Sequence, residues 1–87
     1  MTETVSEFKA RVARLRAECP AWREGQAHFN AMAFDEFGPS SDQIQFCEIV
    51  LDAAPRGSSC PIDPYHNDAN IAAFLAAAVE AGVLREG

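Results

Sequence analysis

The chain has 87 residues, a hydrophobic fraction of 48% and a formal charge of −6. This length fits one domain, and the apolar content is too high for a disordered chain. No apolar run approaches the roughly 20 residues that span a bilayer, and the first residues lack the basic and apolar regions of a secretion signal. We therefore expect residues 1–87 to form a single small domain without membrane association.

The three cysteines are odd in number and widely spaced, so they do not suggest a disulfide framework. This pattern favours a reducing, cytoplasmic location. The cysteines and the two histidines also lack the close ligand pairs of structural zinc sites. No glycine pattern typical of phosphate or dinucleotide binding is present. We therefore expect neither a metal nor a cofactor.

The first predicted helix covers about residues 5 to 18. Thr4 and Glu7 match a capping box, in which each side chain accepts a hydrogen bond from the other residue's backbone amide. One apolar stripe follows at spacings of three and four, made of Val5, Phe8, Val12, Leu15 and Cys19. Four bases fall off this stripe and are expected to face solvent: Lys9, Arg11, Arg14 and Arg16. Pro20 ends the helix.

A second helix is predicted over about residues 21 to 36, and Gly38 and Pro39 end it. Its core-facing residues are Trp22, Phe29, Met32, Ala33 and Phe37. Ser40 and Gln43 form a second candidate capping box, which would open a helix through Ile44, Cys47, Val50 and Leu51. The alternation of Ile44, Gln45 and Phe46 also permits a short strand near 44–51, but we favour the helix.

Residues 55–68, PRGSSCPIDPYHND, are predicted to form a long ordered loop because they are rich in Pro, Gly, Ser and Asp. Asp68 is a good N-cap for a last helix, whose apolar face is Ile71, Phe74, Leu75, Ala78 and Val79. Gly82 should close this helix, so that Val83 and Leu84 fold back onto it. The predicted fold class is all-α, a compact bundle of about four short helices.

The stretch WREGQAHFN, residues 22–30, places polar side chains beside Gly25. A glycine inside a helix costs up to about 1 kcal/mol relative to alanine, which suggests that another backbone packs against it. We predict a structural clamp that holds the long loop, with Tyr65 packed beside Trp22 or Phe29. The clamp residues are Trp22, Arg23, Gln26, Asn30, Asp63 and Tyr65. The alternative is a small polar pocket for a ligand or peptide.

A catalytic alternative comes from Cys60 and His66, which could act as a nucleophile and its base, with Asp63 and Asp68 nearby. No nucleophile elbow or family signature accompanies them. We therefore expect a protein that is not an enzyme and has no catalytic residues.

The clamp stretch, followed by Arg56-Gly57-Ser58 and by Asp63-Pro64-Tyr65-His66-Asn67-Asp68, resembles a group of short uncharacterised bacterial and phage proteins. Their pattern is a GQxxFN helix, an RGT-like turn and a DPFYxD-type loop before a closing helix. The chain departs from it at Tyr65, where Phe is usual, and by a longer segment from Ser58 to Ile62. The resemblance implies a small helical accessory protein. A weaker likeness is to small acidic phage anti-CRISPR proteins.

Charge is unevenly distributed, since residues 1–34 carry five bases and four acids, whereas residues 35–87 carry nine acids and two bases. We predict a partner-binding acidic surface that meets a protein with a basic surface, without direct nucleic-acid binding. Its residues are Asp35, Glu36, Asp42, Glu48 and Asp52. Such a surface could act as a DNA mimic and inhibitor. Another alternative is a structural module, monomer or homodimer, that self-associates through Val83, Leu84 or an exposed Phe.

Overall fold

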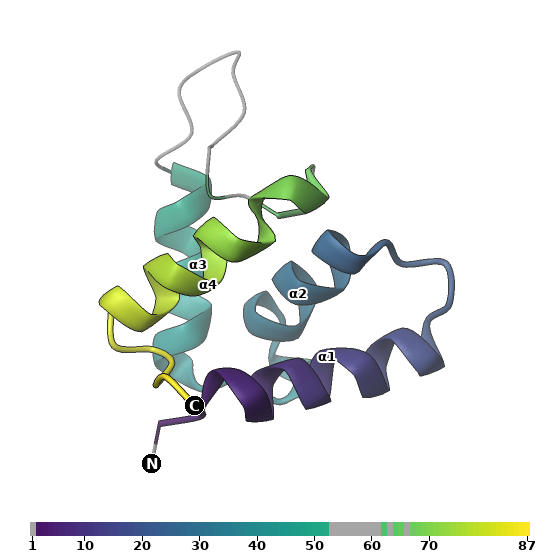
Figure 1. Ribbon diagram of the computed structural model, residues 1–87, viewed down its shortest axis with the longest axis horizontal. Helices are drawn as coiled ribbons and strands as arrows, with labels where there is room; N and C mark the ends of the chain where they lie inside the picture. Colours follow the sequence, from purple (N-terminus) through teal and green to yellow (C-terminus); the bar gives the residue numbers. More distant parts are fainter. Residues whose placement is uncertain (1, 53–61, 63, 66) are drawn as a thin grey trace.

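Figure 1 shows the computed structural model of the chain, which describes residues 2–52, 62, 64–65 and 67–87. The described residues form four α-helices: α1 Val5–Glu18, α2 Glu24–Ala33, α3 Ser41–Asp52 and α4 Ile71–Glu80. Two short 3-10 helices, η1 Asp35–Phe37 and η2 Asp68–Asn70, precede α3 and α4. No strand forms in this part of the chain, so the predicted all-α class is confirmed.

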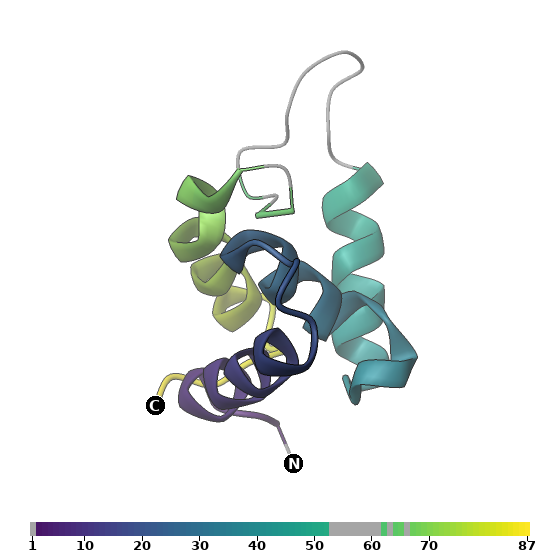
Figure 2. The same ribbon diagram turned by 90° about the vertical axis from the view of Figure 1, so that its right-hand side faces the viewer.

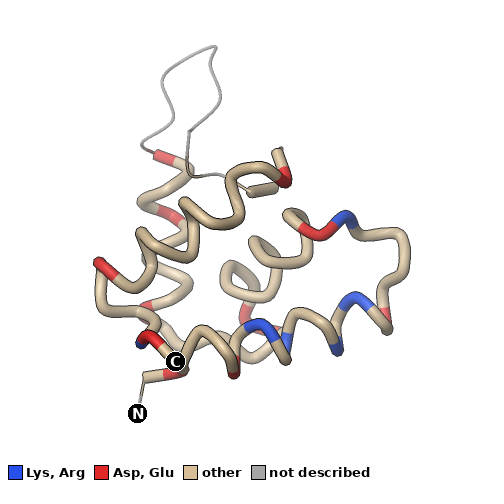
Figure 3. Tube along the Cα trace, viewed as in Figure 1, with Lys and Arg blue, Asp and Glu red and all other residues tan. Residues whose placement is uncertain are grey.

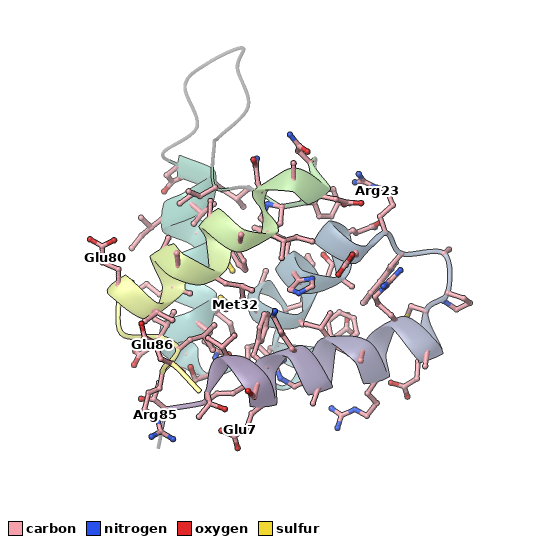
Figure 4. The ribbon with its side chains drawn as sticks, in the orientation of Figure 1. Glu7, Arg23, Met32, Glu80, Arg85 and Glu86 are labelled. Atoms are coloured by element: carbon pink, nitrogen blue, oxygen red, sulfur yellow. The ribbon has the colours of Figure 1, made fainter. Side chains whose placement is uncertain are left out.

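Helix α2 is the centre of the bundle. It lies between α3 and α4, and α1 runs beneath it (Figure 2). Seven of its ten residues are buried, which explains why no wide polar face is left on this helix. Met32 of α2 has no exposed area and lies in the middle of the core (Figure 4). Around it pack aromatic rings, including Phe46 and Phe74 at a centroid distance of 5.7 Å.

Both predicted capping boxes are present. The amide of Glu7 donates to Thr4 Oγ1 at 3.1 Å, and the amide of Thr4 donates to Glu7 Oε1 at 3.0 Å. Ser40 and Gln43 make the same pair of bonds at 3.2 and 3.3 Å. The short strand considered near 44–51 is wrong, because this capping box starts a helix whose core residues recur at spacings of three and four.

The predicted bounds of the second helix, 21 to 36, are wrong at both ends. The amide of Trp22 donates to the Cys19 carbonyl at 3.0 Å in a separate turn, and Arg23 is extended. Phe34 is also extended and separates α2 from η1. The indole of Trp22 packs edge-on against Phe37 at 5.2 Å. Trp22 lies before α2 and Phe37 lies after it, so this contact joins the two segments that flank the helix.

The chain after α4 folds back as predicted. Gly82 has φ +79°, a left-handed conformation that glycine adopts at little cost, and the amide of Val83 donates to the Ala78 carbonyl at 3.0 Å. Val83 and Leu84 are buried in the core. Their own fold thus covers the two residues that the self-association alternative places in a homodimer seam.

Arg11 contradicts the expectation that all four bases of the first helix face solvent, since it is buried. Its guanidinium binds the Glu3 carboxylate through two bonds of 3.1 and 2.9 Å. It also donates to the carbonyls of Phe37, at 2.9 Å, and Ala31. Those carbonyls belong to η1 and the end of α2, so Arg11 joins three segments that are separate in sequence.

Gln43 completes this polar network. Its Oε1 accepts from Arg11 at 3.3 Å, and its Nε2 donates to Glu3 Oε1 at 3.0 Å and to the Val83 carbonyl at 3.2 Å. Burial works to raise the pKa of Glu3, but the bonds from Arg11 and Gln43 and the Arg11 charge outweigh it, so this pKa lies below its ordinary value. The network therefore favours an ionised Glu3 in the folded chain.

Candidate functional site

The five carboxylates predicted to bind a partner are all exposed. Asp35 and Glu36 lie on η1, beside the N-terminal end of α3, and the other three lie on α3 itself (Figures 2 and 3). The core contacts of α3 determine this placement, because they occupy one side of the helix and leave its acids on the rest. We call these five residues the acidic surface: Asp35, Glu36, Asp42, Glu48 and Asp52.

Large apolar side chains are exposed on the same elements. Ile49 is 60% exposed, Leu51 is 52% exposed and Phe34 is 48% exposed, and they are the exposed large hydrophobic residues of the described chain. Ile49 and Leu51 lie on α3, and Phe34 directly precedes η1. Ile49 and Leu51 lie on the two sides of Glu48 and Asp52 around α3, and apolar area beside charged side chains is typical of surfaces that bind other proteins.

Three of the exposed bases lie on a different helix. Lys9, Arg14 and Arg16 are exposed on α1, and Figure 3 shows the basic positions of α1 apart from the acids of α3. The uneven charge of the sequence is thus also uneven in space. Opposite charges at separate surfaces allow each surface to attract a different kind of group.

The residues predicted as a clamp contact the loop in part. The guanidinium of Arg23 donates to the Tyr65 carbonyl and lies 3.7 Å from the Asp68 carboxylate. Arg23 lies just before α2, at the side of the molecule where η2 begins (Figure 4). The Tyr65 ring packs edge-on against Phe29 at 5.8 Å, one of the two neighbours expected for it.

Gly25 lets the loop approach α2 closely. A Cβ at this position would lie 2.1 Å from the Pro64 carbonyl oxygen and 2.6 Å from Asp68 Oδ1. The amide of Gly25 donates to that carboxylate at 3.0 Å. The prediction that Asp68 caps the last helix is therefore wrong: Asn67 accepts from the Ala69 amide at 3.0 Å, while Asp68 caps α2 across the fold.

The other predicted clamp residues do not make these contacts. Trp22 packs against Phe37, not against Tyr65. Gln26 is half-buried, and it forms no hydrogen bond with the described part of the loop. Asn30 is buried, and its Oδ1 accepts no hydrogen bond from the described residues. Asp63 lies outside the described residues.

The catalytic alternative cannot be placed, because Cys60 and His66 lie outside the described residues. Among the residues that are described, no group of three His, Cys, Asp or Glu side chains could hold a metal ion. No helix in the same ranges is long and apolar enough to cross a membrane.

Two hollows open near the N-terminal half of α3. The larger, of about 400 Å³, is polar and lies against Glu3, Ser40, Asp42 and Gln43. A second, of about 200 Å³, lies between Phe46 and Ile49 of α3 and the turn at Gly82. Asp42 is the one residue of the acidic surface that lines these two hollows.

Comparisons with protein-family models, with curated proteins and with solved structures found no match for this chain. The fold and the surfaces define it as a small, mainly α-helical domain with an acidic, partly apolar surface over η1 and α3.

Proposed function

We propose that the protein acts without catalysis by binding another protein through the acidic surface. One observation carries this proposal: the exposed large hydrophobic side chains of the described chain lie on the same elements as the five acids. Apolar area supplies affinity on binding, and carboxylates around it select a basic partner and speed the encounter. The partner is thus a protein whose surface carries Lys and Arg beside an apolar patch.

A more specific form of this proposal is an inhibitor of the phage anti-CRISPR kind. Here the acidic surface occupies a basic groove that otherwise holds nucleic acid. Glu48 and Asp52 are one helical turn apart on α3, and Asp42 lies about 15 Å from Asp52 along the helix axis, at about 1.5 Å per residue. Charges repeated along a rigid rod of this length support the mimicry of phosphates.

Charge reversal tests the proposal. The tagged protein is used to recover partners from a native host lysate at low and high salt, and recovery is repeated with Asp42, Glu48 and Asp52 changed to Lys. The matched control changes Glu18, Glu80 and Glu86 to Lys, since these are also exposed acids and their reversal alters the net charge equally. We expect to recover a partner that is released at high salt. The control variant should still bind this partner, and the variant with Asp42, Glu48 and Asp52 changed to Lys should not.

Retention of every partner by the first variant would contradict the role of the acidic surface. The inhibitor form has its own test. A short DNA or RNA duplex should compete with the protein for the recovered partner, and a partner that binds both together would exclude mimicry.

A further inference from the structure

A third hollow, of about 160 Å³, lies between α1, α2 and the start of α4. Its charged and polar lining comes from Lys9 and Arg16 on α1 and from Glu24 and His28 on α2, and Ile71 of α4 adds an apolar wall. Lys9 and Arg16 are seven residues apart, so they lie on the same side of α1, two turns from each other. The hollow is several times larger than the roughly 30 Å³ of one water molecule.

His28 presents one ring nitrogen that lacks a partner. The side chain is only 4% exposed, and its Nδ1 lies 2.7 Å from the Glu24 carbonyl oxygen. A carbonyl oxygen can only accept, so Nδ1 carries the hydrogen and Nε2 is left to bind something else. Among the described residues, the one hydrogen bond of the His28 ring is that of Nδ1. Nε2 is not among the fully buried unpaired atoms, so it is open to water or to a ligand, and His28 lines the hollow.

The charges around His28 favour an anion. Lys9 and Arg16 are exposed and form no ion pair with any residue that the structure describes. Glu24 is the single acid that lines the hollow, and it offsets one of the two positive charges. A protonated His28 would bring the net charge of the lining to +2.

We propose that this hollow binds a small tetrahedral oxyanion, a phosphate or sulfate group, between Lys9, Arg16 and Nε2 of His28. The two cations supply charge-assisted hydrogen bonds from one helix, and Nε2 of the imidazole becomes a third donor from the other when the ring is protonated. The hollow lies at α1 and α2, apart from the acidic surface, so this site does not depend on the proposed protein-binding function.

Proton uptake links this site to pH. Burial lowers the pKa of His28, and the charges of Lys9 and Arg16 lower it further, against the opposing effects of the Glu24 carbonyl and carboxylate. These are the charged groups that face the ring from the helices packed on it. A bound anion favours the imidazolium form, so it raises this pKa, and binding must then strengthen as the pH falls.

The experiment follows the His28 ring by NMR while sulfate is added, because sulfate keeps its charge across the range used. The two histidine signals are assigned with His66→Gln. Titration between about pH 5 and pH 7.5 brackets the ordinary imidazole pKa of about 6.5. We expect saturable shifts of the His28 signals and a rise of about half a unit or more in its pKa when sulfate is bound.

The substitutions are made at exposed positions, so the variants should fold like the native chain. Lys9→Gln with Arg16→Gln should weaken sulfate binding about tenfold or more, because it removes two charge-assisted contacts. The control with Arg14→Gln removes a base of the same helix that does not line the hollow, and it should keep most of the affinity. Glu24→Gln should tighten binding. Equal loss in the control, or an unchanged His28 pKa with sulfate present, would overturn the proposal.

Discussion

The substitution Gly25→Ala tests the approach of the loop to α2. In an ordinary helix interior this change stabilises by up to about 1 kcal/mol, because alanine has the higher helix propensity. Here the added Cβ would lie 2.1 Å from the Pro64 carbonyl oxygen and 3.1 Å from the Asp68 Cα, both backbone atoms. A flexible side chain could move aside, but these atoms move only if the whole segment moves.

The expected magnitude follows from what that movement breaks. Inserting a methyl group into a packed contact costs about 1 to 3 kcal/mol. Displacing the loop also lengthens the bond from the Gly25 amide to the Asp68 carboxylate, and bonds to a charged group are worth about 1.5 to 3 kcal/mol. After the gain in helix propensity of about 1 kcal/mol is subtracted, we expect the free energy of unfolding to fall by about 1.5 to 5 kcal/mol.

Urea denaturation followed by circular dichroism measures this change, with Ala76→Gly as the control. Ala76 is exposed on α4, so its change reports helix propensity alone and should cost about 1 kcal/mol. If Gly25→Ala stabilised the protein by an amount close to the cost of Ala76→Gly, no loop backbone would lie against α2, and the argument would fail.

Three further predictions concern the first capping box, the Arg11 network and the dependence of stability on pH. Thr4→Ala removes the first capping box and should lower the free energy of unfolding by about 1 kcal/mol, as measured in urea; an unchanged midpoint would contradict the cap. Arg11→Met removes the charged partner of the Glu3 carboxylate, which keeps its bond from Gln43, and takes the Arg11 donor from two carbonyls. It should therefore cost about 3 kcal/mol, and a thermal midpoint equal to that of the native chain would refute the network. Stability should also fall as the medium is acidified. Because the pKa of His28 is lowered from 6.5, the unfolded chain takes up a proton first, so denaturation midpoints should decrease below about pH 6.5. The pKa of Glu3 is lowered from 4.5, so its contribution is present above that pH and is lost as the pH falls through the folded value. Midpoints that stay constant from neutral to mildly acidic pH would contradict the burial of neutral His28.

Local signals predicted α1 and α3. Each begins with a capping box whose two bonds join residues three apart, so the sequence alone contains the whole interaction. The ends of α2 could not be predicted in this way. They depend on the contact between Trp22 and Phe37, which lie 15 positions apart, and nothing nearby in the sequence encodes it.

Arg11 and His28 show why the polar sites were missed. Arg11 falls off the apolar stripe of α1, so the sequence pattern predicts that it is exposed. It is buried because α2 and η1 bring the carbonyls of Ala31 and Phe37 within hydrogen-bond distance of its guanidinium. His28 follows Glu24 by one helical turn, which is a signal for its Nδ1 bond, but its position between Lys9 and Arg16 depends on how α1 crosses α2. Exposure of the acids was simpler to foresee, because Asp and Glu are rarely buried without a partner.

The proposed partner-binding site at the acidic surface and the proposed oxyanion site of the third hollow rest on opposite charges on different helices, so each can be removed without the other. Reversal of Asp42, Glu48 and Asp52 leaves Lys9 and Arg16 in place, and sulfate should still shift the His28 signals in that variant. Neutralising Lys9 and Arg16 leaves α3 intact, and a partner bound through the acids should be retained. Loss of both activities in either variant would mean that the two sites are coupled. The direct interaction between exposed charges is largely screened beyond a Debye length of about 8 to 10 Å. Independent behaviour is therefore the expected result, and it would identify a small helical domain with two separate binding surfaces.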